Sequence, residues 1–405
     1  MKRIAPHTLF FLLISVLYGV PLLLTLFFDI NSEMPYVEKI ILASYKETRF
    51  SVLWIYIISV TAFLFGSGLV NSWLGQKIKH YNIPLAVNPI KRSGLTLSQR
   101  LLIYVFVALG CALVIQMYLA GAFSDYMKSF EASWVAHNMY TVLCEFFFFF
   151  FVYLWINYNG YKKIKAVLLI LIFLTVLKGS RMFVVPLLFL VIYKYIYIDK
   201  RTISKIVRKM LLLGVLAIGG FFFMFFHRHG TSLSGKEIAP FLFLLVQFEA
   251  CGVHIPLMKE ILLGWHTQFA PMVTLISDTI LFLVPRFIWG NKNDYLYFEN
   301  QIRNYDLSPF GGMNGEASAI IYFGVLYPLA FFIIGAACAY IYKLLQTRKY
   351  AWIKPLYVYM CCSLMFTFLR NGVLNASKNM VTILILFLVL ELAKRIIIRP
   401  TKNTL

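Results

Sequence analysis

Apolar residues in this chain form long uninterrupted blocks that are separated by short polar stretches. Six blocks are near the roughly 20 residues that a helix needs to cross the hydrocarbon core of a membrane. They span residues 8–28, 51–74, 101–120, 210–226, 318–342 and 379–393, the last of which belongs to a crossing over 379–396. Four shorter apolar stretches continue the pattern, at 141–157, 166–178, 182–198 and 355–369. The pattern predicts an all-α polytopic membrane protein with about ten transmembrane helices.

Composition agrees with this interpretation and excludes an ordinary soluble protein. The chain is 60% hydrophobic and only 14% charged, whereas a soluble domain carries about a quarter charged residues. Residues 1–405 are therefore expected to form a single integral membrane domain.

The distribution of charge predicts how the chain is oriented. With a cytoplasmic N-terminus and ten crossings, the inner segments hold 24 of the 38 Lys and Arg residues, and the outer segments hold 14 of the 17 acidic residues. Basic residues favour the cytoplasmic side of a membrane, so both termini are expected there. The net charge of +21 then comes from the inner segments, whose basic residues are expected to face anionic lipid headgroups. Nucleic acid is not an expected partner.

Two pairs of crossings are too short to be ordinary hairpins. In the first pair, residues 166–178 supply about 20 Å of helix at 1.5 Å per residue, and the sequence "KGSR" follows. In the second, 355–369 is followed by "RNGVLNASKNM", which predicts a turn over 370–380. Irregular backbone at membrane depth requires protein or water around it. Arg181 and Arg370 are thus expected to share one anion site that opens to the outside, although each arginine alone also fits an interfacial anchor.

A segment of about 90 residues, 227–317, is expected to form a large outer loop of short interfacial or re-entrant helices. If its two apolar segments cross the membrane instead, the chain has up to twelve crossings and the orientation of the ends is unchanged. The loop contains "PRFIWGNK", with Arg286 and Lys292, and ends in "FGGMNGEASAI", with Glu316. A helix that begins here directs the positive end of its dipole outward, which favours an anion.

These motifs together resemble those of Wzy-type O-antigen polymerases, which join oligosaccharide repeat units. The chain segments that carry the likeness are "LKGSRMFVVPLL", "LVPRFIWGNK", "GEASAIIYFGVLYPLAFFIIG" and "FLRNG". Two departures stand out: Asn293 replaces the proline that commonly follows the loop lysine, and strict alignment on Gly324 places Ser318 where the family has its glutamate. Two residues correspond to about 200° of helix rotation, so this shift weakens Glu316 as the catalytic acid or base.

The resemblance implies a GT-C-like fold in the bacterial inner membrane, with the active site on the periplasmic face. It implies a metal-independent glycosyltransferase without cofactors, which moves a growing glycan from undecaprenyl pyrophosphate to the next lipid-linked repeat unit. Arg181, Arg286, Arg370 and Glu316 are the expected catalytic residues. The residues expected to bind substrate are Lys178, Ser180, Lys292 and His229. A chain-length regulator is a further candidate partner, beside the lipid-linked oligosaccharide and the bilayer.

Other functions stay open at this point. An O-antigen ligase would share the architecture and the donor, and a flippase or transporter would place broken helices in inverted repeats. A membrane acyltransferase would need a histidine embedded in a helix, and no histidine is expected in such a place. Glu145 is expected to pair with an apical arginine or to form a structural ion pair, and Glu391 is expected to pair with Lys394 or Arg395 along a helix.

Overall fold

The computed structural model of this chain contains helices and no strands among the residues that it describes, which confirms the predicted all-α class for them. These residues are 4–27, 38–77, 94–119, 134–158, 160–177, 183–199, 270–284, 288–298, 300 and 315–396. Among them, four helices are long and apolar enough to cross a membrane: Leu53–Trp73, Leu97–Leu119, Gly315–Leu345 and Lys354–Lys394. Shorter apolar helices occur at Pro6–Val16, Val142–Asn157, Val184–Ile198 and Val273–Leu283. A membrane protein is therefore supported, and the count of ten crossings stays a prediction.

The chain divides into two compact units. Unit 1 contains residues 1–81, 232–345 and 364–380, and unit 2 contains residues 82–231, 346–363 and 381–405.

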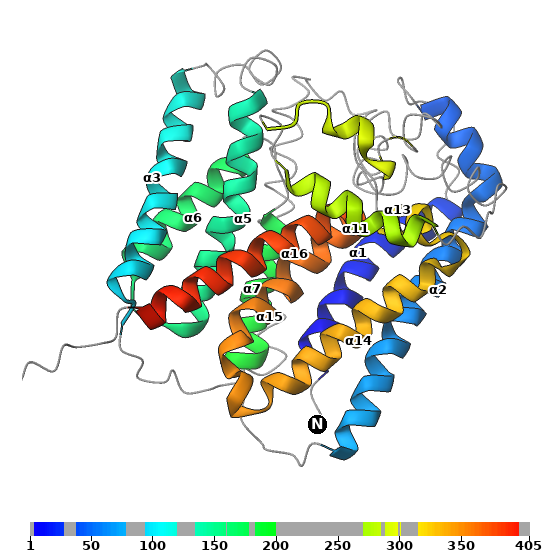
Figure 1. The fold of residues 1–405 in the computed structure, drawn as a ribbon. Helices are drawn as coiled ribbons and strands as arrows, with labels where there is room; N and C mark the ends of the chain where they lie inside the picture. The colour runs from blue at the N-terminus through cyan, green and yellow to red at the C-terminus, as the bar shows by residue number, and fades with distance from the viewer. Residues whose placement is uncertain are drawn as a thin grey trace, which may run out of the picture. The chain divides into compact units, whose positions relative to one another are not determined.

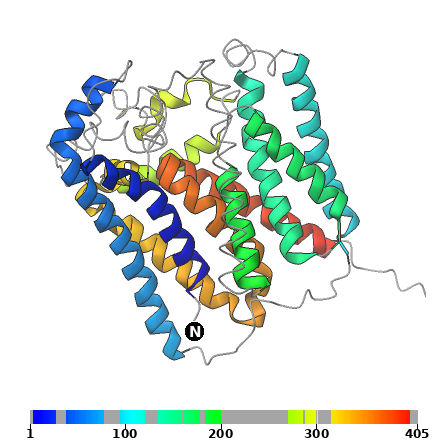
Figure 2. The ribbon, with the colours of Figure 1, turned by 180° about the vertical axis from the view of Figure 1, so that it is seen from behind.

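Three helices of unit 1 lie side by side. They are α1 (Pro6–Phe27), α2 (Glu38–Lys77) and α14 (Tyr327–Leu345) (Figures 1 and 2). Glycines bring α2 and α14 into backbone contact, because a Cβ atom at Gly66 would overlap the carbonyl oxygen of Phe332 and one at Gly335 would overlap that of Phe63. Small residues allow such close approach of helices in membranes. The ring of Phe63 also stacks on that of Phe11, 3.6 Å away between centroids.

The remaining described elements of unit 1 surround the start of one helix. They are α11 (Ala270–Leu283), the short 3₁₀ turn η2 (Lys292–Tyr295), α13 (Gly315–Phe323), η3 (Gly324–Leu326) and the first part of α16 (Met365–Ile396). The predicted crossing over 318–342 is thus interrupted at η3, where Gly324 has a φ of 53°. A left-handed backbone of this kind favours glycine and interrupts the regular helix.

Helices α3 (Leu97–Leu119), α5 (Trp134–Asn157) and α6 (Lys162–Leu177) of unit 2 are neighbours in space (Figures 1 and 2). The phenylalanine run of α5 forms their core, since Phe147, Phe148, Phe149 and Phe150 are all fully buried. The unit also contains α7 (Val184–Tyr193), η1 (Lys194–Ile198), η4 (Arg348–Ile353), α15 (Lys354–Tyr359), most of η5 (Met360–Leu364) and the last part of α16.

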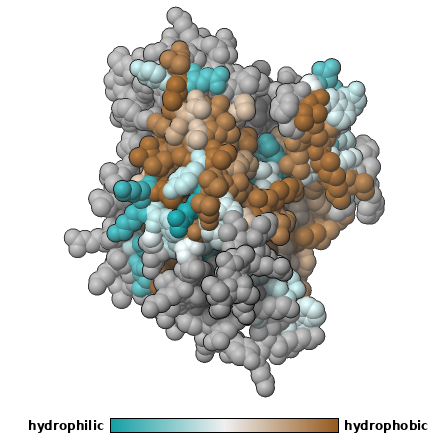
Figure 3. Space-filling model, turned by 60° about the vertical axis from the view of Figure 1, so that its left-hand side comes forward, coloured by the Kyte–Doolittle hydropathy of each residue, from teal (hydrophilic) through white to brown (hydrophobic). Residues whose placement is uncertain are grey.

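The outer face of α3 is apolar, as expected for a helix in contact with lipid. Only 22% of the most apolar stretch of α3 is buried inside the protein. Figure 3 shows apolar residues, coloured brown, gathered on the side of the molecule where α3 lies. The large exposed side chains of this helix are Leu97, Leu101, Tyr104, Val105, Leu109, Ile115, Tyr118 and Leu119. A soluble protein rarely leaves such a continuous apolar surface in water.

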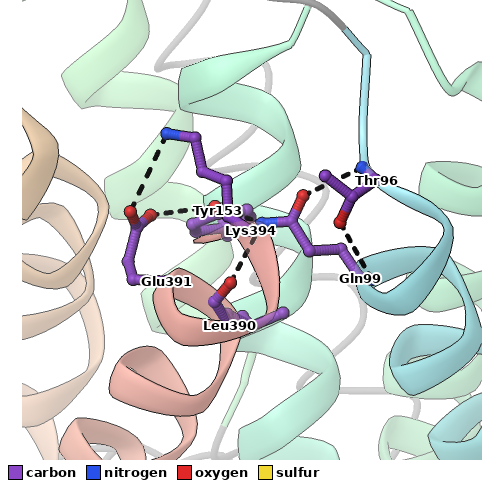
Figure 4. Close-up of polar contacts among 6 residues, drawn as sticks. All are labelled: Thr96, Gln99, Tyr153, Leu390, Glu391 and Lys394. Carbon is purple, nitrogen blue, oxygen red and sulfur yellow. Dashed lines mark hydrogen bonds and ion pairs between the residues drawn. The ribbon is translucent and has the colours of Figure 1, made fainter. Parts of the chain in front are cut away.

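A polar network joins the ends of α3, α5 and α16 within unit 2 (Figure 4). Thr96 and Gln99 form a capping box, in which the Thr96 amide donates to Oε1 of Gln99 (3.1 Å) and the Gln99 amide donates to Oγ1 of Thr96 (3.3 Å). Such reciprocal bonds satisfy amide groups at a helix start. The amide nitrogen of the Gln99 side chain donates to Tyr153 Oη (3.2 Å) and to the Leu390 carbonyl (3.1 Å).

The network places three helix ends on one side. The predicted orientation makes the start of 101–120, the end of 141–157 and the end of 379–396 cytoplasmic, and the network joins those ends. It continues as Tyr153 donates to Glu391 (3.0 Å), and Glu391 pairs with Lys394 (3.9 Å). The predicted pairing of Glu391 with Lys394 is therefore confirmed, and Tyr153 is its unexpected third member.

Candidate functional site

The first turn of α13 packs against the backbone of α16 within unit 1. A Cβ atom on Gly315 would lie 2.8 Å from the Phe368 carbonyl oxygen and 3.2 Å from the Leu369 Cα, so only glycine fits this contact. Three residues later, Ser318 is fully buried, and its hydroxyl group donates to the Gly315 carbonyl (3.0 Å) and accepts from the Val373 amide (2.8 Å). The "GEASA" and "FLRNG" motifs, more than 40 residues apart in sequence, are therefore in direct contact.

The contact lies at a break in α16. Helical geometry is interrupted at Gly372, whose φ of 83° and ψ of 175° belong to a region that is essentially restricted to glycine. The predicted turn over 370–380 is wrong in extent, because residues 373–380 are helical and the break is confined to one residue. Glycine alone provides the change of direction, so the polar residues after it remain in the helix.

Arg370 precedes this break by two residues. Its guanidinium carbon lies 6.0 Å from the centre of the Phe366 ring, and its side chain is half-buried. A guanidinium group is attracted to the face of an aromatic ring and can bind phosphate through two parallel hydrogen bonds.

Glu316 lies in the first turn of α13, between Gly315 and Ser318, and its side chain is 4% exposed. Among the described residues, no other side chain hydrogen-bonds to its carboxylate. Ser318, rather than Glu316, bonds to the broken part of α16. The two-residue shift noted in the sequence therefore has a structural counterpart: Ser318 fixes the backbone of the site, and Glu316 supplies the only acid in this helix turn.

Lys292 is buried, and its ammonium group is held by backbone carbonyls. It donates to the Phe282 carbonyl (2.9 Å) and to the Val284 carbonyl at the C-terminal end of α11. A cation at this position satisfies carbonyl groups that have no partner within the helix. Lys292 thus holds the loop against α11, and the predicted binding of substrate by this residue stays a prediction.

Lys378 is a second cation beside the Phe282 ring, and it was not singled out from the sequence. Its ammonium group lies 4.7 Å from the centre of the Phe282 ring, and that of Lys292 lies 5.3 Å from the same centre. Lys378 follows the break in α16 by six residues. It lies within the stretch 370–380, for which the sequence predicts a turn. Its position in "NASKNM", eight residues after Arg370, was the available signal, because two cations close to one apex indicate an anion site.

Asp278 is a second residue that the sequence did not single out. It is 2% exposed on α11, and its carboxylate accepts from the backbone amides of Tyr297 and Phe298 (3.0 Å each) and from the Tyr322 hydroxyl group (2.7 Å). The rings of Tyr322 and Phe298 stack 5.8 Å apart. One carboxylate therefore joins α11, the segment after η2, and α13.

Five of the predicted site residues lie outside the described part of the chain: Lys178, Ser180, Arg181, His229 and Arg286. The segments that carry Glu316 and Arg370 are in contact. Lys292 caps the C-terminal end of α11. The expected anion site shared by Arg181 and Arg370 stays a prediction. Among the described residues, no group of three His, Cys, Asp or Glu side chains is arranged to hold a metal ion.

Two further predictions concern buried polar residues elsewhere. His7 lies inside α1, fully buried, with Nε2 2.9 Å from the Ser67 hydroxyl oxygen, so the expectation that no histidine is embedded in a helix is wrong. Glu145 accepts hydrogen bonds from Tyr359 Oη (2.8 Å) and Ser363 Oγ (3.4 Å) in unit 2, which gives it hydroxyl partners that the sequence did not predict.

Comparison with known proteins finds no matching family, no similar curated protein and no similar solved structure. The function of the site is therefore argued from its own chemistry and from the motifs in the sequence.

Proposed function

We propose that this chain is a membrane glycosyltransferase that polymerises lipid-linked oligosaccharide repeat units, as the resemblance to Wzy-type polymerases implies. The observation that carries the proposal is the contact between the first turn of α13 and the break in α16. It brings the segment of a buried carboxylate, Glu316, next to the segment of Arg370. An acid and a cation are the two groups that transfer of a sugar from a pyrophosphate requires.

The proposed reaction joins a sugar hydroxyl to the anomeric carbon of the donor glycan. The new bond forms between the acceptor oxygen and that carbon, while the bond from the carbon to the pyrophosphate oxygen breaks. The acceptor proton moves to Glu316, and the leaving group departs as undecaprenyl pyrophosphate. A carboxylate in reach of the hydroxyl group is suited to general-base catalysis.

Negative charge develops on the pyrophosphate as the sugar leaves it. Arg370 and Lys378 flank the break in α16 and would stabilise that charge, the arginine through bidentate hydrogen bonds and the lysine as a point charge. Fixed cations aimed at developing charge are among the largest contributions to catalysis. Arg181 and Arg286 remain proposed members of the same site, on the motifs that they share with the family.

The polarity of the chain supports the proposed location. The basic residues favour a cytoplasmic position for the opposite ends of these helices, so Glu316 and Arg370 would face the periplasm from the inner membrane. Polymers of the cell surface are assembled from lipid-linked units on that face, as the resemblance implies.

The test is complementation of a deletion strain, followed by gel analysis of its surface polysaccharide. We expect wild-type protein to restore long chains, and Arg370→Ala and Glu316→Gln to leave cores that carry a single repeat unit. Lys394→Ala removes a cation from the far part of α16 and serves as the control, with long chains expected. Normal chain length from both site variants would overturn the proposal, and cores without any repeat unit would indicate a ligase instead.

A further inference from the structure

Two lysines of unit 2 meet at the C-terminal turn of α5, away from the groups used in the proposed transfer reaction. The ammonium group of Lys165, on α6, donates to the Tyr158 carbonyl at 2.6 Å. That of Lys194, at the start of η1, lies 5.3 Å from the centre of the Trp155 ring. Because Trp155 and Tyr158 are three residues apart in one helical turn, they lie on the same side of it. The two ammonium groups therefore approach one small surface from two different elements.

Within the part of the chain that the structure describes, no acidic group pairs with either lysine. The nearest acid along the chain, Asp199, is exposed at the end of η1. Burial, and after it the positive charge of Lys194, lower the pKa of Lys165. Two half-buried cations without an anion between them are unfavourable, so the arrangement indicates an anionic ligand.

The lysines also lie where apolar helices begin and end. Residues 166–177 of α6 and all of α7 contain no charged side chain, so each lysine marks the edge of an apolar segment. Trp155, Tyr158 and Tyr161 surround the same edge. Tryptophan and tyrosine are enriched at the level of lipid headgroups, which is the level of the lipid phosphate.

The local backbone is specialised at this point as well. α7 continues into η1, a π-helical turn. π-Helical turns are rare and occur frequently at functional sites. Lys194 is the first residue of this turn.

We propose that Lys165 and Lys194 bind the phosphate of an anionic phospholipid of the bilayer, with Trp155 beside the headgroup. The phosphate diester accepts hydrogen bonds from both ammonium groups and neutralises the pair. A soluble phosphate has the same charge, but a site at the edge of two apolar helices also receives acyl chains, which only a lipid provides. The proposal is independent of the glycosyltransferase assignment.

The experiment measures thermal unfolding of the full-length protein in uncharged detergent during titration with phosphatidylglycerol. Phosphatidylcholine and inorganic phosphate are titrated in parallel. A ligand that binds only the folded protein raises the midpoint of unfolding. Lys165→Gln/Lys194→Gln removes the pair, and Lys162→Gln/Lys163→Gln removes two exposed lysines from the same helix as the matched control.

We expect phosphatidylglycerol to stabilise the wild type and the control variant equally. The Lys165→Gln/Lys194→Gln variant should bind it roughly 30-fold more weakly, since each lysine at an anionic surface contributes about 1 kcal/mol. Lys165→Arg/Lys194→Arg keeps the charges and should retain most of the binding, which shows that lost binding is not lost folding. If the double glutamine variant does not fold, the single Lys194→Gln variant should show a roughly fivefold loss.

Three results would overturn the proposal. Equal losses in the two glutamine double variants would mean a diffuse effect of net charge. Equal stabilisation by phosphatidylcholine would exclude a site for anionic lipid, and equal stabilisation by inorganic phosphate would assign the lysines to a soluble anion.

Discussion

The hydroxyl group of Ser318 accepts a hydrogen bond from the backbone amide of Val373 over 2.8 Å, and it donates one to the Gly315 carbonyl. The amide of Val373 follows the non-helical Gly372 directly, so it cannot be satisfied by the regular pattern of the helix. A side chain from α13 therefore completes the hydrogen bonding of a break in α16. Ser318 acts as a positioning residue for Arg370 on one side of the break and Glu316 on its own helix.

Replacement of Ser318 by alanine should destabilise the protein by about 1–3 kcal/mol, because it leaves a buried backbone amide without a partner. Thermal unfolding of the detergent-purified protein measures the effect. Ser277→Ala is the control, since the exposed Ser277 hydroxyl bonds only to the Thr274 carbonyl of its own helix. Equal stability of the Ser318→Ala and wild-type proteins would mean that the hydrogen bond to Val373 contributes nothing.

Replacement of Gly372 by alanine should be more harmful than an ordinary glycine substitution in a helix. The φ of 83° and ψ of 175° disfavour any residue with a Cβ atom by about 1–3 kcal/mol. Gly68→Ala is the matched control, because Gly68 is exposed in α2 with open space around a Cβ atom, and alanine there should stabilise the helix by about 0.5–1 kcal/mol. Opposite shifts in the unfolding temperature are expected, and a neutral Gly372→Ala variant would contradict the break.

Much of the helical framework could be predicted from the sequence, because the length of an apolar block determines which residues leave water. The blocks at 101–120 and 166–178 correspond to α3 at Leu97–Leu119 and α6 at Lys162–Leu177. The block at 51–74 underestimated α2, which begins at Glu38, since polar residues continue a helix without adding to hydropathy. Local irregularities such as η3 could not be predicted, because glycine permits a left-handed backbone without requiring it.

The candidate site was harder to predict than the helices. Glu316 and Arg370 were recognised from motifs, and the structure places their segments in contact. Asp278 and Lys378 were missed because their significance comes from partners distant in sequence, Tyr322 and Phe282. A single sequence contains the residue types of such a pair but not the information that they meet.

Substitution of the two lysines beside the Phe282 ring should distinguish a structural role from a functional one. Lys292→Met keeps the length of the side chain but removes two hydrogen bonds to backbone carbonyls, so it should lower stability by about 1.5–3 kcal/mol or more. Lys378→Met loses the contact with the Phe282 ring and should lower stability less than Lys292→Met does. If the glycosyltransferase proposal is correct, Lys378→Met should reduce chain extension about a hundredfold, as the loss of one fixed electrostatic group does elsewhere.

The two lysine variants are compared by thermal unfolding and by the length of surface polysaccharide. A Lys378→Met variant with normal chain length would remove Lys378 from the proposed site. A stable, inactive Lys292→Met variant would support the substrate-binding role that the sequence predicts.

Asp278 should be sensitive even to replacement by asparagine. Both of its oxygens accept from donors, with Tyr297 N–H on one and Phe298 N–H and Tyr322 Oη on the other. An asparagine amide group would direct its own N–H groups at one of these donors, so we expect a loss of about 1.5–3 kcal/mol. Tyr322→Phe removes only one of the three bonds and should cost less. An Asp278→Asn/Tyr322→Phe double variant whose effect equals the sum of the single effects would argue against coupling of the two residues.

Gln99 should be the most sensitive polar residue of unit 2, because its side chain makes three hydrogen bonds to three different elements (Figure 4). Gln99→Ala keeps the backbone bond to Thr96 Oγ1 but removes the side-chain half of the capping box, and it leaves the Leu390 carbonyl and the Thr96 amide without this partner. We therefore expect a total loss of about 2–4 kcal/mol. Gln99→Glu separates the two effects, because its carboxylate still accepts from the Thr96 amide but cannot donate to Leu390 or Tyr153. Because the second oxygen of this buried carboxylate would face the Leu390 carbonyl, the unfolding temperature of this variant should lie at or below that of Gln99→Ala. A Gln99→Glu variant as stable as wild type would show that the bonds across α5 and α16 contribute nothing.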